Sequence, residues 1–106
     1  GKAVGIECDV RSFEDQIGAV SKTIEFFGAI DVLVANAGVG HFASIEDMEI
    51  EKWNEVIDTN LTGVFYSIKA ALQALKKARV TLLLFQVWRV PTFSQQHRHT
   101  MQVNLD

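Results

Sequence analysis

The start of the chain shows two kinds of hydrophobic spacing, a short apolar run followed by a helical repeat. The run from Ala3 to Cys8 is typical of a β-strand. Beyond it, apolar residues recur at steps of three and four, which predicts one apolar face of an α-helix over residues 13 to 27. That face consists of Phe13, Ile17, Val20, Ile24 and Phe27. Ser12 and Asp15 resemble a capping box at the start of the helix, and Gly28 favours its end.

A second apolar run and a second helical repeat follow. Residues Ile30 to Ala35 are apolar apart from Asp31, as a parallel strand needs when helices cover both of its faces. After a glycine-rich turn and a polar loop, a helical pattern runs from Ile50 to about Ala78. Gly63 lies inside that pattern at a cost of about 1 kcal/mol relative to alanine, which suggests a packing or functional reason. The order strand, helix, strand, helix predicts an α/β fold with a doubly wound parallel sheet.

The last part of the chain changes character. Residues 80 to 90 are apolar and strand-like, whereas residues 91 to 106 are polar and show neither a helical nor a strand period. We therefore expect two parts, a domain segment over residues 1 to 79 and a divergent tail over residues 80 to 106.

Composition narrows the class of protein. At 106 residues, with 48% hydrophobic and 22% charged residues, the chain is typical of at most one globular domain. A net charge of -3 provides no basic patch for nucleic acid or an anionic membrane, so neither partner is expected. No apolar run reaches the roughly 20 residues that span a bilayer. Cys8 is the only cysteine, which excludes an internal disulfide and favours a reducing, cytoplasmic setting.

Candidate binding residues follow the two predicted strands. Asp9 and Val10 come after the first strand, and Asn36, Ala37 and Gly38 come after the second. In an open α/β sheet, ligands bind outside the carboxyl ends of the strands. Small residues in such a turn allow a ligand to approach the backbone closely. The alternative is that the Asn-Ala-Gly turn is purely structural.

Two motifs together resemble a known family. Residues 31 to 38 read Asp-Val-Leu-Val-Ala-Asn-Ala-Gly, and Asn60-Leu61-Thr62-Gly63 follows one helix later. The chain resembles the middle of a short-chain dehydrogenase/reductase. The resemblance implies part of a Rossmann-like sheet, NAD or NADP as cofactor, and hydride transfer between that cofactor and a small-molecule carbonyl or alcohol. Ala35 stands where the commonest form of the family has another asparagine.

The resemblance also implies roles for these residues. Asp9 and the backbone amide of Val10 would contact the adenine ring, and the turn 36–38 would line the adenosine ribose. Asn60 would lie at a local break in its helix, where its backbone carbonyl holds a water of the catalytic proton relay. The alternative for Asn60 is an exposed helical asparagine. The helix over residues 53 to 75 corresponds to part of a subunit interface, so a homo-oligomer is expected.

The chain departs from the family at both ends. The family's glycine-rich phosphate loop would precede Gly1, and its Ser and Tyr-x-x-x-Lys do not appear after Val80. We therefore expect a fragment that is inactive as written. A non-catalytic nucleotide-binding or oligomerising remnant is one alternative, and an unrelated α/β domain with accidental motifs is another. Tyr66 and Lys69 are spaced one residue too closely for the catalytic pair.

A change of reading frame is our hypothesis for the tail. When the last base of each codon is read with the first two of the next, Thr100 can become Tyr, Gln102 becomes Ala and Asn104 can become Lys. The shifted line can therefore read Tyr-Asn-Ala-Ser-Lys.

The pair His97 and His99 could suggest a metal, but further ligands are lacking nearby, so no metal site is expected.

Overall fold

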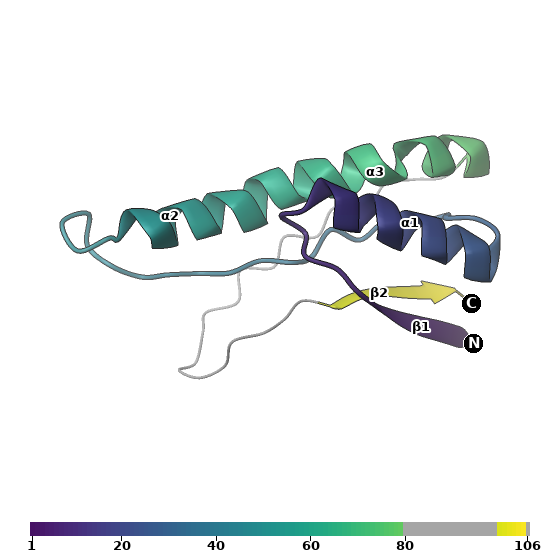
Figure 1. Ribbon diagram of the computed structural model, residues 1–106, viewed down its shortest axis with the longest axis horizontal. Helices are drawn as coiled ribbons and strands as arrows, with labels where there is room; N and C mark the ends of the chain where they lie inside the picture. The colour runs from purple at the N-terminus through teal and green to yellow at the C-terminus, as the bar shows by residue number, and fades with distance from the viewer. Residues whose placement is uncertain (80–99, 106) are drawn as a thin grey trace.

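The computed structural model describes residues 1–79 and 100–105. The elements in chain order are β1 (Lys2–Glu7), α1 (Phe13–Phe27), α2 (Ile50–Ile57), the π-helix η1 (Asp58–Thr62), α3 (Gly63–Ala78) and β2 (Thr100–Leu105). Helices α2, η1 and α3 join into one long rod, with α1 packed beside α3 and the two strands below α1 (Figure 1). The strand predicted at residues 3–8 and the helix predicted at 13–27 are confirmed.

The two strands form an antiparallel pair. Their register runs from Lys2 opposite Leu105 to Glu7 opposite Thr100. Residues 100–105 therefore form a strand that the sequence pattern, which lacks a strand period after residue 91, did not predict. An antiparallel ladder is made by backbone N–H and C=O groups, so a segment without alternating side chains can still form one. The parallel pairing of a doubly wound sheet is not found between the two described strands.

Local signals set the ends of α1. The backbone N–H of Asp15 donates to Ser12 Oγ at 3.2 Å, as the capping sequence predicts. Gly28 ends the helix with φ of 85°, a left-handed conformation that glycine adopts without steric cost. Its N–H donates to the carbonyl oxygen of Ile24 at 2.7 Å. Both predicted ends of this helix are therefore confirmed.

The buried face of α1 differs from the predicted one. Ile17 and Ile24 are 45% and 38% exposed. The buried residues of this helix are Gln16, Ala19, Val20 and Thr23. The reason is that α1 lies against two elements at once. Ala19 packs with residues of β1, whereas Val20 packs with residues of α3, so the centre of the buried face falls between those two positions.

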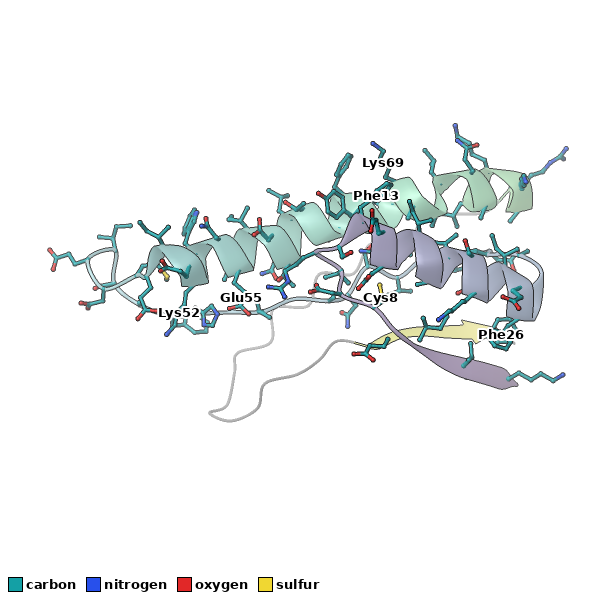
Figure 2. The ribbon with its side chains drawn as sticks, in the orientation of Figure 1. Cys8, Phe13, Phe26, Lys52, Glu55 and Lys69 are labelled. Carbon is teal, nitrogen blue, oxygen red and sulfur yellow. The ribbon has the colours of Figure 1, made fainter. Side chains whose placement is uncertain are left out.

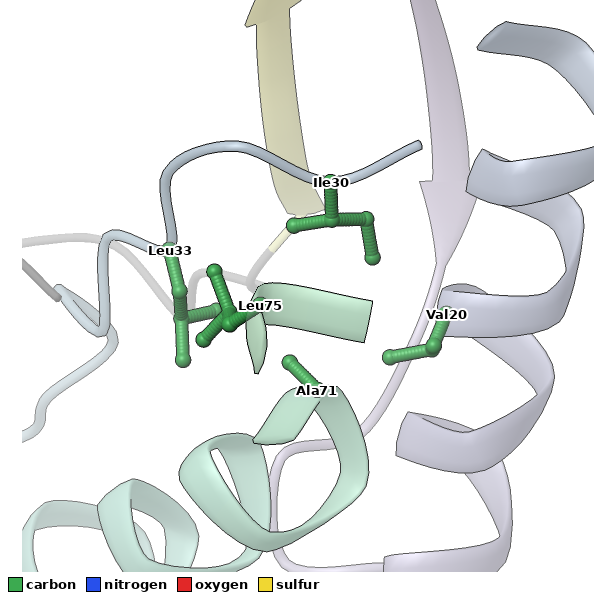
Figure 3. Packing of buried hydrophobic residues seen from close by; sticks show 5 residues of the cluster. All are labelled: Val20, Ile30, Leu33, Ala71 and Leu75. Carbon is green, nitrogen blue, oxygen red and sulfur yellow. The ribbon is translucent and has the colours of Figure 1, made fainter. Parts of the chain in front are cut away.

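The main core lies between α1, α3 and the segment that follows α1. Val20 meets Ala71 and Leu75 of α3, and Ile30 and Leu33 close the cluster from the third side (Figure 3). A smaller cluster joins Ile6, Cys8 and Ala19 beneath α1. Burial of such side chains contributes about 25 cal/mol per Å² of apolar surface.

The segment Ile30 to Ala35 is not the doubly covered strand that was predicted. Among the described residues it carries one isolated bridge residue, Val34, and no continuous strand. Ile30, Leu33 and Ala35 are buried, but Val32 and Val34 are 42% and 48% exposed. Its buried residues pack against α1 and α3, while its other face is left uncovered by the described residues. The apolar run therefore reflects one-sided burial here.

The long helical repeat is interrupted where the family resemblance implies a break. The π-helix η1 separates α2 from α3, and the N–H of Gly63 closes it by donating to the carbonyl of Asp58. A Cβ at Gly63 would lie 3.0 Å from Val10 Cγ2, so close packing against Val10 is one reason for this glycine. The strand-like residues 80–90 lie outside the described part of the chain. None of the described helices is long and apolar enough for a membrane span.

Candidate functional site

The turn after β1 is held by charged groups. The carboxylate of Asp9 accepts hydrogen bonds from Arg11 Nε at 3.1 Å and Arg11 Nη2 at 2.9 Å. The backbone N–H of Arg11 also donates to this carboxylate, at 2.9 Å, and the N–H of Asp9 donates to Asp15 Oδ2 at 3.1 Å. The bond to Asp9 raises the pKa of Arg11. Arg11 therefore orients the carboxylate of Asp9, and both side chains stay partly exposed to solvent.

The turn after the second apolar run is joined to the helix break. The side-chain amide of Asn60 accepts from the N–H of Val39 and donates to the carbonyl of Val39, both at 2.8 Å. We call this pair of bonds the Asn60 clamp. A Cβ at Gly38 would lie 3.3 Å from Asn60 Oδ1, so the glycine allows this close approach. The structure thus brings the Asn-Ala-Gly turn and the predicted catalytic asparagine together.

A second contact fastens the same loop to α2. His41 Nε2 lies 2.7 Å from Glu55 Oε2, and both side chains are only partly exposed. Figure 2 shows Glu55 on the side of the helical rod that faces this loop. With the Asn60 clamp, the loop after residue 38 is held at two points along the rod. Of the predicted turn itself, Asn36 is exposed and Ala37 is partly buried.

A buried side-chain network links the turn after β1 to the start of α3 through Gln16 of α1. Gln16 Nε2 donates to the carbonyl of Val10 at 3.0 Å and to that of Gly63 at 3.2 Å. The hydroxyl of Ser67 donates to Gln16 Oε1 at 3.0 Å. Gln16 was not among the residues predicted from the sequence, although one signal was present. It lies three residues after Phe13 and four before Val20, on the predicted apolar side of its helix. Val39, His41 and Glu55 carried no such signal.

The tyrosine and lysine on α3 belong to an aromatic cluster. The ring of Tyr66 lies 5.4 Å from that of Phe13, and Lys69 Nζ lies 5.6 Å from the Phe13 ring centroid. Figure 2 shows Phe13 at the start of α1 and Lys69 on the neighbouring part of α3. Tyr66 and Lys69 therefore make ordinary packing contacts of a helix surface, as their spacing predicts.

The remaining candidates for chemistry are few. Cys8 is buried, and burial, followed by the nearby carboxylates of Asp15 and Asp9, raises the pKa of its thiol. A raised pKa keeps the thiol protonated, so it is a poor nucleophile. No group of three or more His, Cys, Asp or Glu residues that could hold a metal ion occurs among residues 1–79 and 100–105. His97 and His99 lie outside those residues.

Among the described residues, the two turns present hydrogen-bonding and small groups, and no cluster that could hold a metal ion. The turns at 9–10 and 36–38 offer an acidic side chain, backbone amides and small side chains. These groups can bind a flat base and a sugar. Solved structures that resemble this chain, with TM-scores of 0.69 and 0.70, place it in the class of α/β proteins of the Rossmann type.

The chain belongs to the short-chain dehydrogenase family. The family described as short chain dehydrogenase matches residues 1–85. A trans-4-hydroxycyclohexanecarboxylate dehydrogenase from Sinomonas cyclohexanicum is 41% identical over 76 residues, which are 72% of this chain and 29% of that protein. This chain therefore spans less than a third of that relative's length.

Two solved structures show the same likeness in three dimensions. An alcohol dehydrogenase from the archaeon Thermococcus sibiricus, complexed with 5-hydroxy-NADP, is 39% identical with a TM-score of 0.69. The match covers 73% of this chain and 33% of that one. A carveol dehydrogenase from Mycobacterium avium, in complex with NAD, is 35% identical with a TM-score of 0.66, covering 72% of this chain and 28% of that one. The family membership predicted from the two motifs is confirmed.

Proposed function

We propose that the chain forms the adenosine-side part of an NAD(P)-dependent oxidoreductase that acts on a small-molecule carbonyl or alcohol. The observation that carries this proposal is the Asn60 clamp, which joins the Asn-Ala-Gly turn to the helix break. A nicotinamide cofactor supplies or accepts the hydride in such chemistry. The complexes of the two solved relatives with NAD and with an NADP derivative support this choice of cofactor.

Each site residue has a proposed task. Asp9 and the backbone amide of Val10 bind the adenine ring, while Asn36, Ala37 and Gly38 line the adenosine ribose. The backbone carbonyl of Asn60, in the π-helix, holds the water of the proton relay. The Asn60 side chain keeps the neighbouring loop in place through Val39. Proton transfer and substrate orientation need groups beyond this set.

We propose that the 106-residue chain by itself turns over substrate negligibly. The family's acid/base is a tyrosine with a lysine four residues later, and the only tyrosine here is Tyr66. That ring packs against Phe13. A positioned acid/base contributes about 10²–10⁴-fold to the rate. The proposal assumes that the chain binds small molecules in a reducing, cytoplasmic setting. The free thiol of Cys8 is in line with such a setting.

Calorimetric titration of the full chain tests the binding part of the proposal. We expect AMP and NADH to bind and nicotinamide mononucleotide not to bind, because the proposed contacts lie on the adenosine side. Asp9→Ala should weaken AMP binding, whereas Asp31→Ala, which alters another exposed aspartate, should leave it unchanged. Failure of both AMP and NADH to bind at millimolar concentration would disprove nucleotide binding.

A homo-oligomer formed through the helical rod is a second proposal, and one specific observation favours it. Trp53, Leu61 and Phe65 are 54%, 66% and 56% exposed. These residues lie on α2, η1 and α3, which together form the helical rod. Exposed apolar patches mark sites of protein association. This proposal also covers the alternative of a non-catalytic oligomerising remnant, since it needs no catalytic group.

A further inference from the structure

The side chain of Gln16 is almost completely buried, at 1% exposure, and all of its hydrogen-bonding groups can be accounted for. A glutamine amide has two N–H donors and one carbonyl acceptor. The donors reach the carbonyls of Val10 and Gly63, and the acceptor receives the Ser67 hydroxyl. A fully satisfied polar group of this kind specifies the arrangement of its partners.

Its partners belong to the two halves of the proposed site. Val10 follows Asp9 in the first turn, and Gly63 is the residue whose N–H closes the π-helix that contains Asn60. The same two partners also pack directly, since a Cβ at Gly63 would lie 3.0 Å from Val10 Cγ2. Gln16 therefore bridges the first turn and the start of α3, where Val10 and Gly63 lie close together.

Electrostatics explain why an amide is needed there. The Val10 and Gly63 carbonyl oxygens both approach Gln16 Nε2, within 3.0 and 3.2 Å. Two carbonyl oxygens that converge on one buried point repel each other unless donors lie between them. The amide supplies both donors without a net charge.

We propose that Gln16 is a positioning residue of the nucleotide site. It holds the π-helix in place against the first turn, and so it sets the position from which Asn60 clamps Val39. The nucleotide-affinity readout below rests on the proposed function, but the structural coupling from Gln16 to Val39 does not.

Gln16→Glu in the full 106-residue chain is the main test. Ionised glutamate has no donor for the two carbonyls, whereas the protonated acid regains one O–H donor. We expect the amide of Val39, followed by NMR hydrogen exchange, to lose about tenfold in protection as the pH rises through the pKa of the new carboxyl, which burial will raise. The amide of Gly28, bonded to Ile24 at the far end of α1, should keep its protection. The wild-type chain should show no such pH step at Val39.

Two further variants separate positioning from general stability. Gln16→Met has a similar volume and no donors, so Val39 should lose protection at every pH. Ser67→Ala removes the hydroxyl contacts to Gln16 Oε1 and to the Gly63 carbonyl. It leaves both Gln16 donors on their carbonyls, so Val39 should stay protected. Equal loss at Val39 and Gly28 in Gln16→Glu, or full Val39 protection in Gln16→Met, would overturn the proposal. If Gln16→Met does not fold, the reversible pH step in Gln16→Glu decides.

Nucleotide affinity gives the second readout. With AMP as the probe, Gln16→Glu should bind about tenfold more weakly above the pKa of the new carboxyl and should recover below it. Absence of AMP binding to the wild-type chain would defeat the proposed function. The exchange of the Val39 amide would still decide the role of Gln16.

Discussion

Two glycines and one asparagine determine how closely the loop after residue 36, the first turn and the helical rod approach one another. Gly38 leaves room for Asn60 Oδ1, and Gly63 leaves room for Val10. The Asn60 amide then acts like a short piece of strand, because it both accepts from and donates to the backbone of Val39. At the scale of residues, the role of each position follows from the contacts that an added atom would crowd or a removed atom would lose.

Asn60→Ala removes both bonds to Val39. Each such bond is worth about 0.5–1.5 kcal/mol, so we expect the free energy of unfolding to fall by about 2 kcal/mol. Urea denaturation followed by circular dichroism measures it. Asn54→Ala is the matched control, since Asn54 is an exposed asparagine of α2, and its effect should stay within about 0.5 kcal/mol. Equal effects of the two substitutions would contradict the importance of the clamp.

Alanine should have opposite effects at two helical glycines. Gly18 has no atom within 4 Å of an added Cβ, so Gly18→Ala should stabilise the fold by about 1 kcal/mol. Gly63→Ala gains the same helix propensity but presses on Val10 Cγ2, and overpacking costs about 1–3 kcal/mol. We therefore expect a net loss, measured by thermal denaturation. Stabilisation by both substitutions would show that the Val10 side chain moves aside at little cost in free energy.

The thiol of Cys8 should titrate at unusually high pH. Burial raises its pKa above the ordinary value of 9.0, with Asp15 and then Asp9 adding to the effect. The stability that the protonated thiol contributes is present below the ordinary pKa and is lost as pH rises through the folded value. Ultraviolet absorbance of the thiolate should rise only above pH 9.0 in the folded chain and near its ordinary value in urea. A midpoint near neutral pH would contradict this.

The helical rod of α2, η1 and α3 combines two tasks at the scale of elements. One side holds the loop after residue 38 and packs on α1, through Glu55, Asn60 and Ala71. The rod also carries large apolar side chains that no described residue covers, Trp53 and Phe65 among them. The first task concerns the site, and the second concerns assembly.

The proposed self-association should depend on that exposed apolar surface. Trp53→Lys adds a charge in place of a large apolar side chain, and burying an unpaired charge is costly. Sedimentation velocity should therefore show a shift from oligomer to monomer. Asn54→Lys introduces the same residue one position along the helix and should leave the oligomer intact, because it replaces a polar group. A wild-type chain that is monomeric at high concentration would disprove the interface.

At the scale of the whole molecule, the family match covers residues 1–85, and a divergent tail after residue 79 stays a prediction. The described strand β2 covers Thr100–Leu105, and these residues overlap the place where the shifted reading frame can encode Tyr-x-Ala-Ser-Lys. In the chain as written, the same residues instead pair antiparallel with β1. The proposal of a frame-shifted tail therefore concerns the gene, while the pairing concerns this polypeptide.

Sequencing the gene across the tail tests that proposal at the scale of the whole chain. We expect codons that permit Tyr, Ala, Ser and Lys in the shifted frame opposite residues 100–104. Codon choices that exclude the motif would end the frame hypothesis.

The purified 106-residue chain should fail to oxidise NADH or NADPH with a panel of ketones. Measurable turnover would refute the proposed inactivity.

The sequence by itself determined the family, the ends of α1 and the residues of both turns. These depend on local features, such as a serine cap, a glycine stop and a small-residue turn, which act within a few positions of the chain. The break around Asn60 was also foreseen, although only through the family resemblance. Asn60 and the turn 36–38 could therefore be chosen before any contact was known.

The tertiary structure decided how these parts meet. The Asn60 clamp joins residues 21 positions apart, and Gln16 reaches Gly63 and Ser67 across 47 and 51 positions. The buried face of α1 shifted toward Gln16 and Ala19 because two neighbours share that helix, and the run 30–35 was buried on one face only. Periodicity reports how apolar a segment is, but the direction from which neighbours cover it depends on contacts between distant residues.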